Sequence, residues 1–242
     1  KSAVQSFGKP VLIFAGAGSG KTRVLTHKIA YLANENLIPE KNILAVTFTN
    51  KAAQEMKIRV ASLNKKKTIE ATIGTFHSIC ARILRKEIKN IGFTPDFTIF
   101  DVQDQISLSK VILDEMKVTK DILSPQNAKY LISNYKNKLI FPEELLSKAN
   151  NAQEKLFAEF YKKYQDSLFD NNAADFDDLL LLPLKLFKEN PTILKKYQDL
   201  WKYVLVDEYQ DTNKPQFEFI HYLTKEHKQV CVVGDDDQSI YG

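Results

Sequence analysis

A glycine-rich segment that ends in lysine and threonine has the clearest chemical potential in this sequence. Residues 15–22 read Ala-Gly-Ala-Gly-Ser-Gly-Lys-Thr; they follow the apolar run 11–14 and precede apolar residues at helical spacing. Glycine permits positive φ and lets another group approach the backbone closely. Between a strand and a helix, this pattern predicts a loop whose backbone N–H groups surround a phosphate.

The side chains of this segment have distinct expected roles. Lys21 would reach the β- and γ-phosphates of a bound nucleotide, and the Thr22 hydroxyl would bind Mg²⁺. Ala15 stands at the first position of the pattern, where glycine is usual. The simpler alternative is a glycine turn without a ligand. The residues expected to contact the nucleotide phosphates are Ala15, Gly16, Ala17, Gly18, Ser19, Gly20, Lys21 and Thr22.

Two carboxylates follow an apolar run much later in the chain. Asp207 and Glu208 come directly after the run 203–206. Because the carboxyl ends of parallel strands meet at one edge of a sheet, both can lie beside the glycine-rich loop. We expect Asp207 to hold Mg²⁺ through water, and Glu208 to act as general base or to orient the attacking water. The alternative is an acidic pair that faces solvent at a strand end.

A second polar segment follows the apolar run 229–233. It contains three adjacent aspartates and then Gln238. Such a segment is ordinarily a solvated turn. We expect this segment at the same sheet edge, where the Gln238 amide could contact the γ-phosphate. The amide could then sense the loss of the γ-phosphate. The predicted catalytic set is therefore Lys21, Glu208 and Gln238.

Composition narrows the class of protein. The 242 residues carry 34 Lys and Arg against 30 Asp and Glu, a net charge of +4, and 44% of them are hydrophobic. This content argues against disorder, and no run approaches the roughly 18 apolar residues of a membrane span. Cys80 and Cys231 are too few for a disulfide framework, which favours a reducing compartment. The charge alone does not predict a nucleic-acid partner. The chain opens at Lys1 and closes in a polar loop at Gly242, so we expect a fragment.

Apolar runs predict strands that alternate with helices. The strand candidates are 11–15, 43–48, 69–73, 203–207 and 229–233. This alternation favours an α/β fold with an open, mainly parallel sheet and right-handed crossovers. A helix over 50–62 begins after a Thr-Asn pair suited to N-capping.

Helical spacing of apolar residues dominates the middle of the chain. It predicts an all-helical inserted domain over 91–172, with the sheet-containing core at 1–90 and 173–242. Asp175-Phe176-Asp177-Asp178 is expected to open a helix, because the helix dipole favours carboxylates in the first turn.

Six segments together resemble a known family. AGAGSGKT (15–22), TFTNKAA (47–53), GTFHS (74–78), DFDDL (175–179), VDEYQDTN (206–213) and VGDDDQSIYG (233–242) are similar in order and spacing to the motifs of superfamily 1 DNA helicases. They resemble most the UvrD/Rep/PcrA group. The resemblance implies a RecA-like P-loop NTPase core interrupted by a helical domain, which uses ATP and Mg²⁺. It also implies a bacterial, cytoplasmic 3′→5′ motor in DNA repair or replication, with single-stranded DNA and single–double-strand junctions as partners.

The same resemblance assigns roles to individual residues. Lys21, Thr22, Asp207, Glu208 and Gln238 match the family's ATP and Mg²⁺ positions, and Arg23 matches a position near the adenine. Bases stack on aromatic rings at about 1–3 kcal/mol each irrespective of sequence. Without the resemblance, each aromatic residue would be assigned to the core. The positions that match DNA contacts are Phe48, Thr49, Asn50, Thr75, His77, Phe176 and Tyr241.

Several functions remain open at this point. The resemblance implies that a C-terminal half, with a second RecA-like domain and its arginines, lies outside the chain. Such arginines contribute about 10³–10⁵ in rate, so the isolated chain is expected to hydrolyse ATP weakly or not at all. The alternatives are the helicase subunit of a recombination helicase–nuclease and a non-hydrolytic module that binds ATP and DNA. A small-molecule kinase is a weaker alternative, because no acceptor site accompanies the loop.

Overall fold

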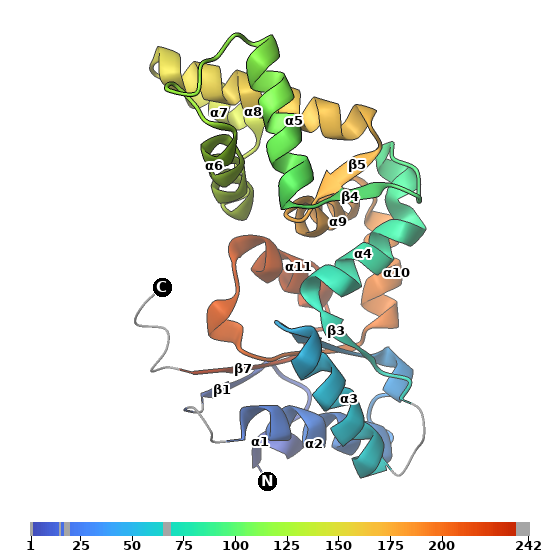
Figure 1. Cartoon of the computed structure of the whole chain (residues 1–242). Helices are drawn as coiled ribbons and strands as arrows, with labels where there is room; N and C mark the ends of the chain where they lie inside the picture. Colours follow the sequence, from blue (N-terminus) through green and yellow to red (C-terminus); the bar gives the residue numbers. More distant parts are fainter. Residues whose placement is uncertain (1, 15, 17–19, 65–68, 236–242) are drawn as a thin grey trace. The chain divides into compact units, whose positions relative to one another are not determined.

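The computed structural model describes residues 2–14, 16, 20–64 and 69–235 (Figure 1). The chain divides into two compact units. The sheet unit comprises Lys1–Ile79, Phe187–Thr212 and Gln216–Gly242. The helical unit comprises Cys80–Leu186 and Asn213–Pro215.

Within the described residues, the sheet unit holds a five-stranded parallel sheet. The strand order is β1 (Val11–Phe14), β7 (Val230–Gly234), β6 (Tyr203–Val206), β2 (Ile43–Thr47) and β3 (Thr72–Thr75). All five predicted strands are confirmed, although β3 starts later than the predicted 69–73. Ile69 and Ala71 pack against the core ahead of the strand, so their apolar character reflects burial and not pairing.

Helices cover both faces of this sheet. Alternate strand residues such as Ala45 and Leu205 pack with α2 (Lys21–Asn34) and α3 (Asn50–Asn64), whereas α11 (Lys214–Thr224) lies on the other side (Figure 1). Burial on both sides explains why β2 and β6 read as continuous apolar runs. The edge strand β1 alternates instead and leaves Leu12 and Phe14 exposed on one face. The remaining helical elements of this unit are α1 (Ser2–Gln5), α10 (Pro191–Leu200) and the 3₁₀ helices Glu40–Asn42 and Tyr209–Asp211.

The predicted N-cap of α3 is confirmed. The Thr49 hydroxyl oxygen accepts a hydrogen bond from the backbone N–H of Ala52 at 3.1 Å. Thr49 thereby satisfies one of the N–H groups that a helix start leaves without a partner.

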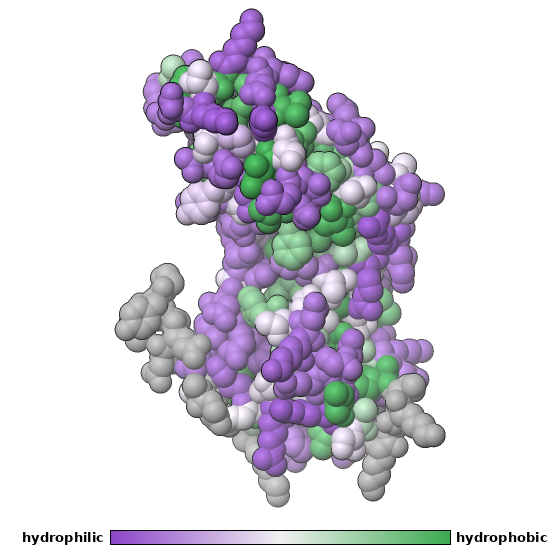
Figure 2. Space-filling view, viewed as in Figure 1, coloured by the Kyte–Doolittle hydropathy of each residue, from purple (hydrophilic) through white to green (hydrophobic). Residues whose placement is uncertain are grey.

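The helical unit is built around aromatic residues of one long helix. Phe157, Phe160, Tyr161 and Tyr164 of α8 (Ala152–Asp170) are buried against apolar residues of α5 (Val102–Glu115) and α6 (Pro125–Asn137). The other helical elements are α4 (Phe76–Glu87), the 3₁₀ helix Ile88–Ile91, α7 (Pro142–Lys148) and α9 (Asp178–Glu189). On the face shown in Figure 2, hydrophilic side chains cover most of the surface, as amphipathic helices with buried apolar sides require.

The prediction of an all-helical insertion was wrong in one respect. Strand β4 (Thr98–Phe100) lies within 91–172 and pairs in parallel with β5 (Ala173–Asp175). Strands of three residues are too short to produce a recognisable alternating pattern. The compact units divide the chain after Ile79 and after Leu186, so α4 lies mostly, and α9 largely, in the helical unit. The functional domain borders at 90/91 and 172/173 stay predictions.

None of the helices in the described part of the chain combines the length and the apolar character that a bilayer crossing requires.

Candidate active site

The start of α2 is shaped to receive an anion. Gly20 precedes the helix with φ 87° and ψ 30°, a left-handed conformation that favours glycine, and no side chain caps the helix. A Cβ added to Gly16 would have no atom within 4 Å, so the described part of the loop leaves open space. Helix N–H groups and the helix dipole favour a phosphate at such a position. Ala15, Ala17, Gly18 and Ser19 lie outside the described residues.

Lys21 is held by two carboxylates. Its side chain is 8% exposed, and its ammonium group donates to Glu208 Oε2 at 2.9 Å and to Asp235 Oδ2 at 3.2 Å. Burial by itself would lower the pKa of Lys21, but the hydrogen bonds and charges of the two carboxylates outweigh it and raise the pKa. Lys21 is therefore a charged group, and a phosphate that approaches the helix start would compete with these carboxylates for it.

The two predicted magnesium ligands lie together. The Thr22 hydroxyl donates to Asp207 Oδ2 at 3.0 Å, and Asp207 is 3% exposed. Burial raises the pKa of Asp207, and the hydrogen bond from Thr22 works against that shift. Mg²⁺ prefers hard oxygen ligands and commonly takes one or two from the protein, with water and phosphate oxygens as the others. The hydroxyl–carboxylate pair therefore fits a magnesium–nucleotide complex.

Glu208 occupies an unusual backbone conformation. It has φ 48° and ψ 49°, in the left-handed region that residues other than glycine rarely adopt. Such conformations cost about 1–3 kcal/mol and concentrate at functional sites. The Glu208 side chain is 37% exposed, so water reaches the carboxylate, and the Gln210 amide donates to Glu208 Oε2 at 2.7 Å. A carboxylate that meets water and is held by a neighbouring amide suits a general base.

Sequence reasoning did not assign roles to Gln210 and Asp235. Gln210 Oε1 accepts the backbone N–H of Asp235 at 3.0 Å, so this amide links the segments that follow β6 and β7. A Cβ on Gly234 would lie 3.2 Å from Gln210 Oε1, a close approach that favours glycine. Both residues follow apolar runs that the sequence predicts to be strands. Their contact could not be predicted, because it requires β6 and β7 to be neighbours in the sheet. Gln238 lies outside the described residues.

Arg23 is exposed on α2 at the rim of a surface pocket of about 400 Å³. The pocket also contains His27 and Arg59, from α2 and α3. Its walls therefore combine two arginines with apolar side chains such as Ile58 and Leu63. The placement of Arg23 near the adenine stays a prediction.

The residues expected to contact DNA in the sheet unit follow two neighbouring strands. Thr47 of β2 pairs with Thr75 of β3, so the segments after these strands start side by side. The Phe48 ring packs edge-on against Phe76, with ring centres 5.7 Å apart. Thr49 and Asn50 are exposed, whereas Thr75 is 8% exposed.

His77 is uncharged at neutral pH. Burial lowers the pKa of this imidazole to about 4, well below its usual 6.5. A neutral imidazole can still donate or accept a hydrogen bond.

Phe176 lies in the helical unit and is 54% exposed. The backbone on either side of it is fixed by a reciprocal pair of hydrogen bonds: the Asp178 N–H donates to Asp175 Oδ1 at 2.9 Å, and the Asp175 N–H donates to Asp178 Oδ2 at 3.2 Å. This arrangement confirms the expected helix start at α9. The contact of Phe176 with DNA stays a prediction. Tyr241 lies outside the described residues.

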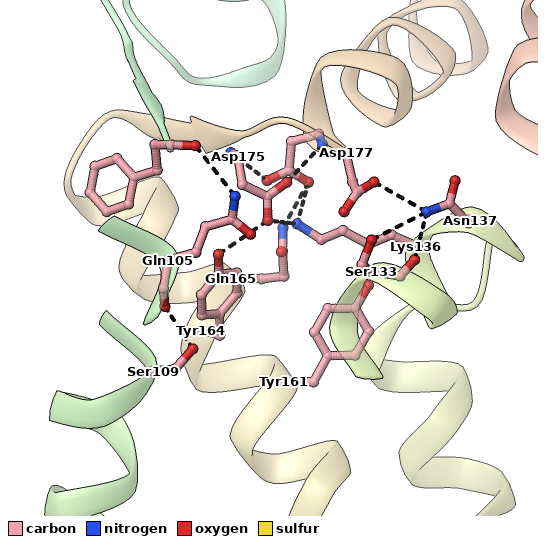
Figure 3. A network of polar contacts seen from close by, with 12 residues as sticks. Gln105, Ser109, Ser133, Lys136, Asn137, Tyr161, Tyr164, Gln165, Asp175 and Asp177 are labelled. Atoms are coloured by element: carbon pink, nitrogen blue, oxygen red, sulfur yellow. Dashed lines mark hydrogen bonds and ion pairs between the residues drawn. The ribbon is translucent and has the colours of Figure 1, made fainter. Parts of the chain in front are cut away.

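A buried lysine holds this helix start. Lys136 Nζ is 2.6 Å from Asp175 Oδ2 and 2.8 Å from Asp178 Oδ1, and the Tyr164 hydroxyl donates to Asp175 Oδ2 at 3.1 Å (Figure 3). The Lys136 and Asp175 side chains are 0% exposed. Burial, together with the charge of Asp175, raises the pKa of Asp178 to about 6. Sequence reasoning missed Lys136, because a lysine in a polar helical segment is typical of a solvated face.

The whole chain matches a known family. Residues 1–242 match the sequence model of the UvrD/REP helicase N-terminal domain. The ATP-dependent DNA helicase PcrA of Staphylococcus epidermidis is 48% identical over 240 residues, which are 99% of this chain and 33% of that protein. The Bacillus subtilis protein of the same name is 46% identical over 241 residues, 100% of this chain and 33% of that protein. The chain therefore spans about a third of the length of these relatives.

Proposed function

Because the chain belongs to the UvrD/REP helicase N-terminal domain family, we propose that it is the N-terminal motor part of an ATP-dependent DNA helicase. The observation that carries this proposal is a set of hydrogen bonds that joins Lys21 to Glu208, Thr22 to Asp207 and the Glu208 N–H to Asp207. The four come from the two ends of the sheet unit's sequence. A RecA-like core of residues 1–90 and 173–242 that binds ATP and Mg²⁺ accounts for their meeting at one edge of a parallel sheet.

Each side chain has a task in ATP hydrolysis. Lys21 leaves its carboxylate partners to bind the β- and γ-phosphates, a charge-assisted contact. Thr22 and Asp207 hold Mg²⁺, which when bound offsets the negative charge of the phosphates. Glu208 takes the proton of the attacking water, and Gln210 keeps the Glu208 carboxylate in place. Gln238 contacts the γ-phosphate, and Arg23 lies near the adenine.

Single-stranded DNA is the proposed polymer substrate. Phe48, Phe176 and Tyr241 supply rings for stacking, which is tolerant of base sequence and therefore suits a motor that moves along any strand. Thr49, Asn50, Thr75 and His77 supply hydrogen bonds. We propose 3′→5′ movement, a role in DNA repair or replication, and a bacterial cytoplasmic location, all supported by the family relationship.

Two other functions fit the same residues. A helicase subunit of a recombination helicase–nuclease would carry the same motor residues, and a carboxylate-rich nuclease motif elsewhere in the full-length sequence would favour it. A non-hydrolytic module that binds ATP and DNA is favoured if single-stranded DNA leaves phosphate release by the full-length protein unchanged. We favour the hydrolytic motor over the non-hydrolytic module, because the relatives are named as ATP-dependent DNA helicases.

Strand separation by the full-length protein tests the proposal. Duplexes with a 3′ or a 5′ single-stranded tail are incubated with ATP and Mg²⁺, and the displaced strand is measured. We expect displacement from the 3′-tailed duplex, and none by the Lys21→Met protein, because Lys21 is needed for the phosphates. Preference for the 5′ tail contradicts the proposed direction, and displacement without ATP contradicts the proposed motor.

A further inference from the structure

A short segment after the proposed catalytic carboxylates belongs to the helical unit. Residues 213–215 group with Cys80–Leu186, whereas the residues on either side of them group with the sheet unit. The Asn213 amide donates to Asn137 Oδ1 at 2.6 Å, and Lys214 Nζ donates to the backbone oxygen of Lys138 at 3.3 Å. The polypeptide that carries Glu208 is thus anchored, five residues later, at the end of α6.

The hydrogen-bond chain continues from Asn137 to the segment that carries Phe176. Asn137 Nδ2 donates to Asp177 Oδ1 at 3.1 Å and also to the backbone oxygen of Ser133 at 2.8 Å (Figure 3). The Asn137 side chain therefore uses its oxygen for Asn213 and its nitrogen for Asp177. A change in the position of Asn213 alters the contact of the residue next to the exposed ring of Phe176.

Buried ion pairs surround the hydrogen bonds between Asn213, Asn137 and Asp177. Lys136, the neighbour of Asn137, is fully buried and binds Asp175 and Asp178, the two residues that start α9. Buried charge pairs with hydrogen bonds at both partners leave few alternative arrangements. Asp177, whose carboxylate also has a pKa raised by burial, is therefore the point in 175–178 that Asn137 can influence.

The polypeptide before Asn213 leads back to the proposed nucleotide site. Lys21 donates to Glu208 Oε2 at 2.9 Å, and a phosphate that binds Lys21 would compete with this carboxylate. Only Tyr209–Thr212 separate Glu208 from Asn213. This connection is a hydrogen-bonded 3₁₀ turn, with the Asp211 N–H donating to the Glu208 oxygen at 3.0 Å and the Thr212 N–H to the Tyr209 oxygen at 3.1 Å. A stiff connection transmits a movement of Glu208 that a flexible loop would absorb.

We propose that Asn213 and Asn137 are positioning residues that couple the nucleotide site to the DNA-contacting segment around Phe176. The inference rests on the proposed function. The bistable element is the segment 207–212, which has one arrangement with Lys21 bound to Glu208 and another with Lys21 bound to phosphate. The hydrogen bonds from Asn213 through Asn137 to Asp177 transmit that difference to the segment around Phe176. Because coupling between two sites is reciprocal, DNA bound at Phe176 also favours one of the two arrangements of Glu208.

Kinetics of the full-length protein test this coupling. ATP hydrolysis is measured without DNA and with saturating single-stranded DNA for Asn213→Ala, Asn137→Ala and the double variant. Neither residue touches the nucleotide, so hydrolysis without DNA should stay within about twofold of wild type, whereas stimulation by DNA should fall about tenfold. The double variant should lose no more stimulation by DNA than either single variant. The effects of two residues in the same hydrogen-bond network do not add.

Two further variants separate coupling from folding. Asn213→Asp keeps the side-chain volume but replaces the donor that faces Asn137, so it should lose stimulation as Asn213→Ala does. Lys214→Ala removes the neighbouring exposed contact to the Lys138 oxygen and should keep full stimulation. Full stimulation in Asn213→Ala, losses that multiply in the double variant, or an equal loss of hydrolysis with and without DNA would each overturn the coupling. Absence of stimulation in the wild type would instead refute the proposed function.

Discussion

Replacing the buried Lys136 by methionine is a sharp test of what holds the helical unit together. Methionine is similar in length to lysine but carries no charge. In the folded chain, Lys136→Met leaves two carboxylates buried without their cation: the Asp175 and Asp178 side chains are 0% and 4% exposed. Removing one partner of a buried ion pair costs about 3–5 kcal/mol. Since whole domains are stable by about 5–15 kcal/mol, this single change removes a large share of the stability.

The stability lost in Lys136→Met should depend on pH. In the variant, the pKa of Asp178 rises further above its ordinary value, because burial and Asp175 still raise it and the cation that lowers it is gone. Between the unfolded and folded pKa values the folded variant binds more protons than the unfolded chain, so its free energy of unfolding falls as pH rises. The stability difference from wild type should therefore be larger at about pH 8 than at about pH 5.

Urea unfolding followed by far-ultraviolet circular dichroism measures this difference, and hydrogen exchange of α6 and α9 peptides locates it. Lys162→Met is the matched control. Its ion pair with Asp166 is exposed, with side chains 49% and 58% accessible, so its loss should not be measurable. A penalty for Lys136→Met below about 1 kcal/mol, the value of a surface pair, would refute the reasoning. So would a penalty that does not change with pH.

Three further predictions follow from other parts of the chain. Gly74→Ala places a Cβ 2.7 Å from the Ser78 hydroxyl and should destabilise the protein by about 1–3 kcal/mol in urea unfolding, with partial recovery in Gly74→Ala/Ser78→Ala; a neutral Gly74→Ala contradicts this packing. The His77 imidazole should titrate near pH 4 by NMR. Because the unfolded chain then binds the extra proton first, stability should fall as pH drops from 6.5 towards 4, and less so in His77→Gln. A midpoint at the usual value would show that His77 is not desolvated. Phe176→Ala should weaken binding of single-stranded DNA by about 1–3 kcal/mol, whereas Tyr130→Ala, on the exposed side of α6, should not; equal affinities for both would remove Phe176 from the DNA contacts.

The parts of the fold that follow from local pattern were predictable. The central strands β2 and β6 are buried on both faces and read as apolar runs, and α2 begins at Lys21 as the helical spacing of the apolar residues after it predicts. For the same reason the meeting of Lys21 with Glu208 was foreseeable in outline, since parallel strands end at one edge.

The parts that depend on long-range pairing were not predictable. Gln210 contacts the Asp235 backbone only because β6 and β7 are neighbours, and no local pattern states the strand order. Lys136 is buried because two carboxylates from a segment 39 residues away meet it, whereas its own neighbours are polar. The β4–β5 pair joins residues far apart in the chain through strands that are too short to recognise.

Hydrolysis by the full-length protein carrying Glu208→Gln is the most direct test of the proposed site. ATP–Mg²⁺ affinity and turnover in the presence of single-stranded DNA are measured on the same samples, with Glu159→Gln, an exposed glutamate of α8, as control. Because Lys21, Thr22 and Asp207 remain, affinity should stay near wild type while turnover falls about 10²–10⁴-fold, the contribution of a general base. Undiminished turnover in Glu208→Gln, with the control also active, would contradict the assignment of Glu208 and the mechanism built on it.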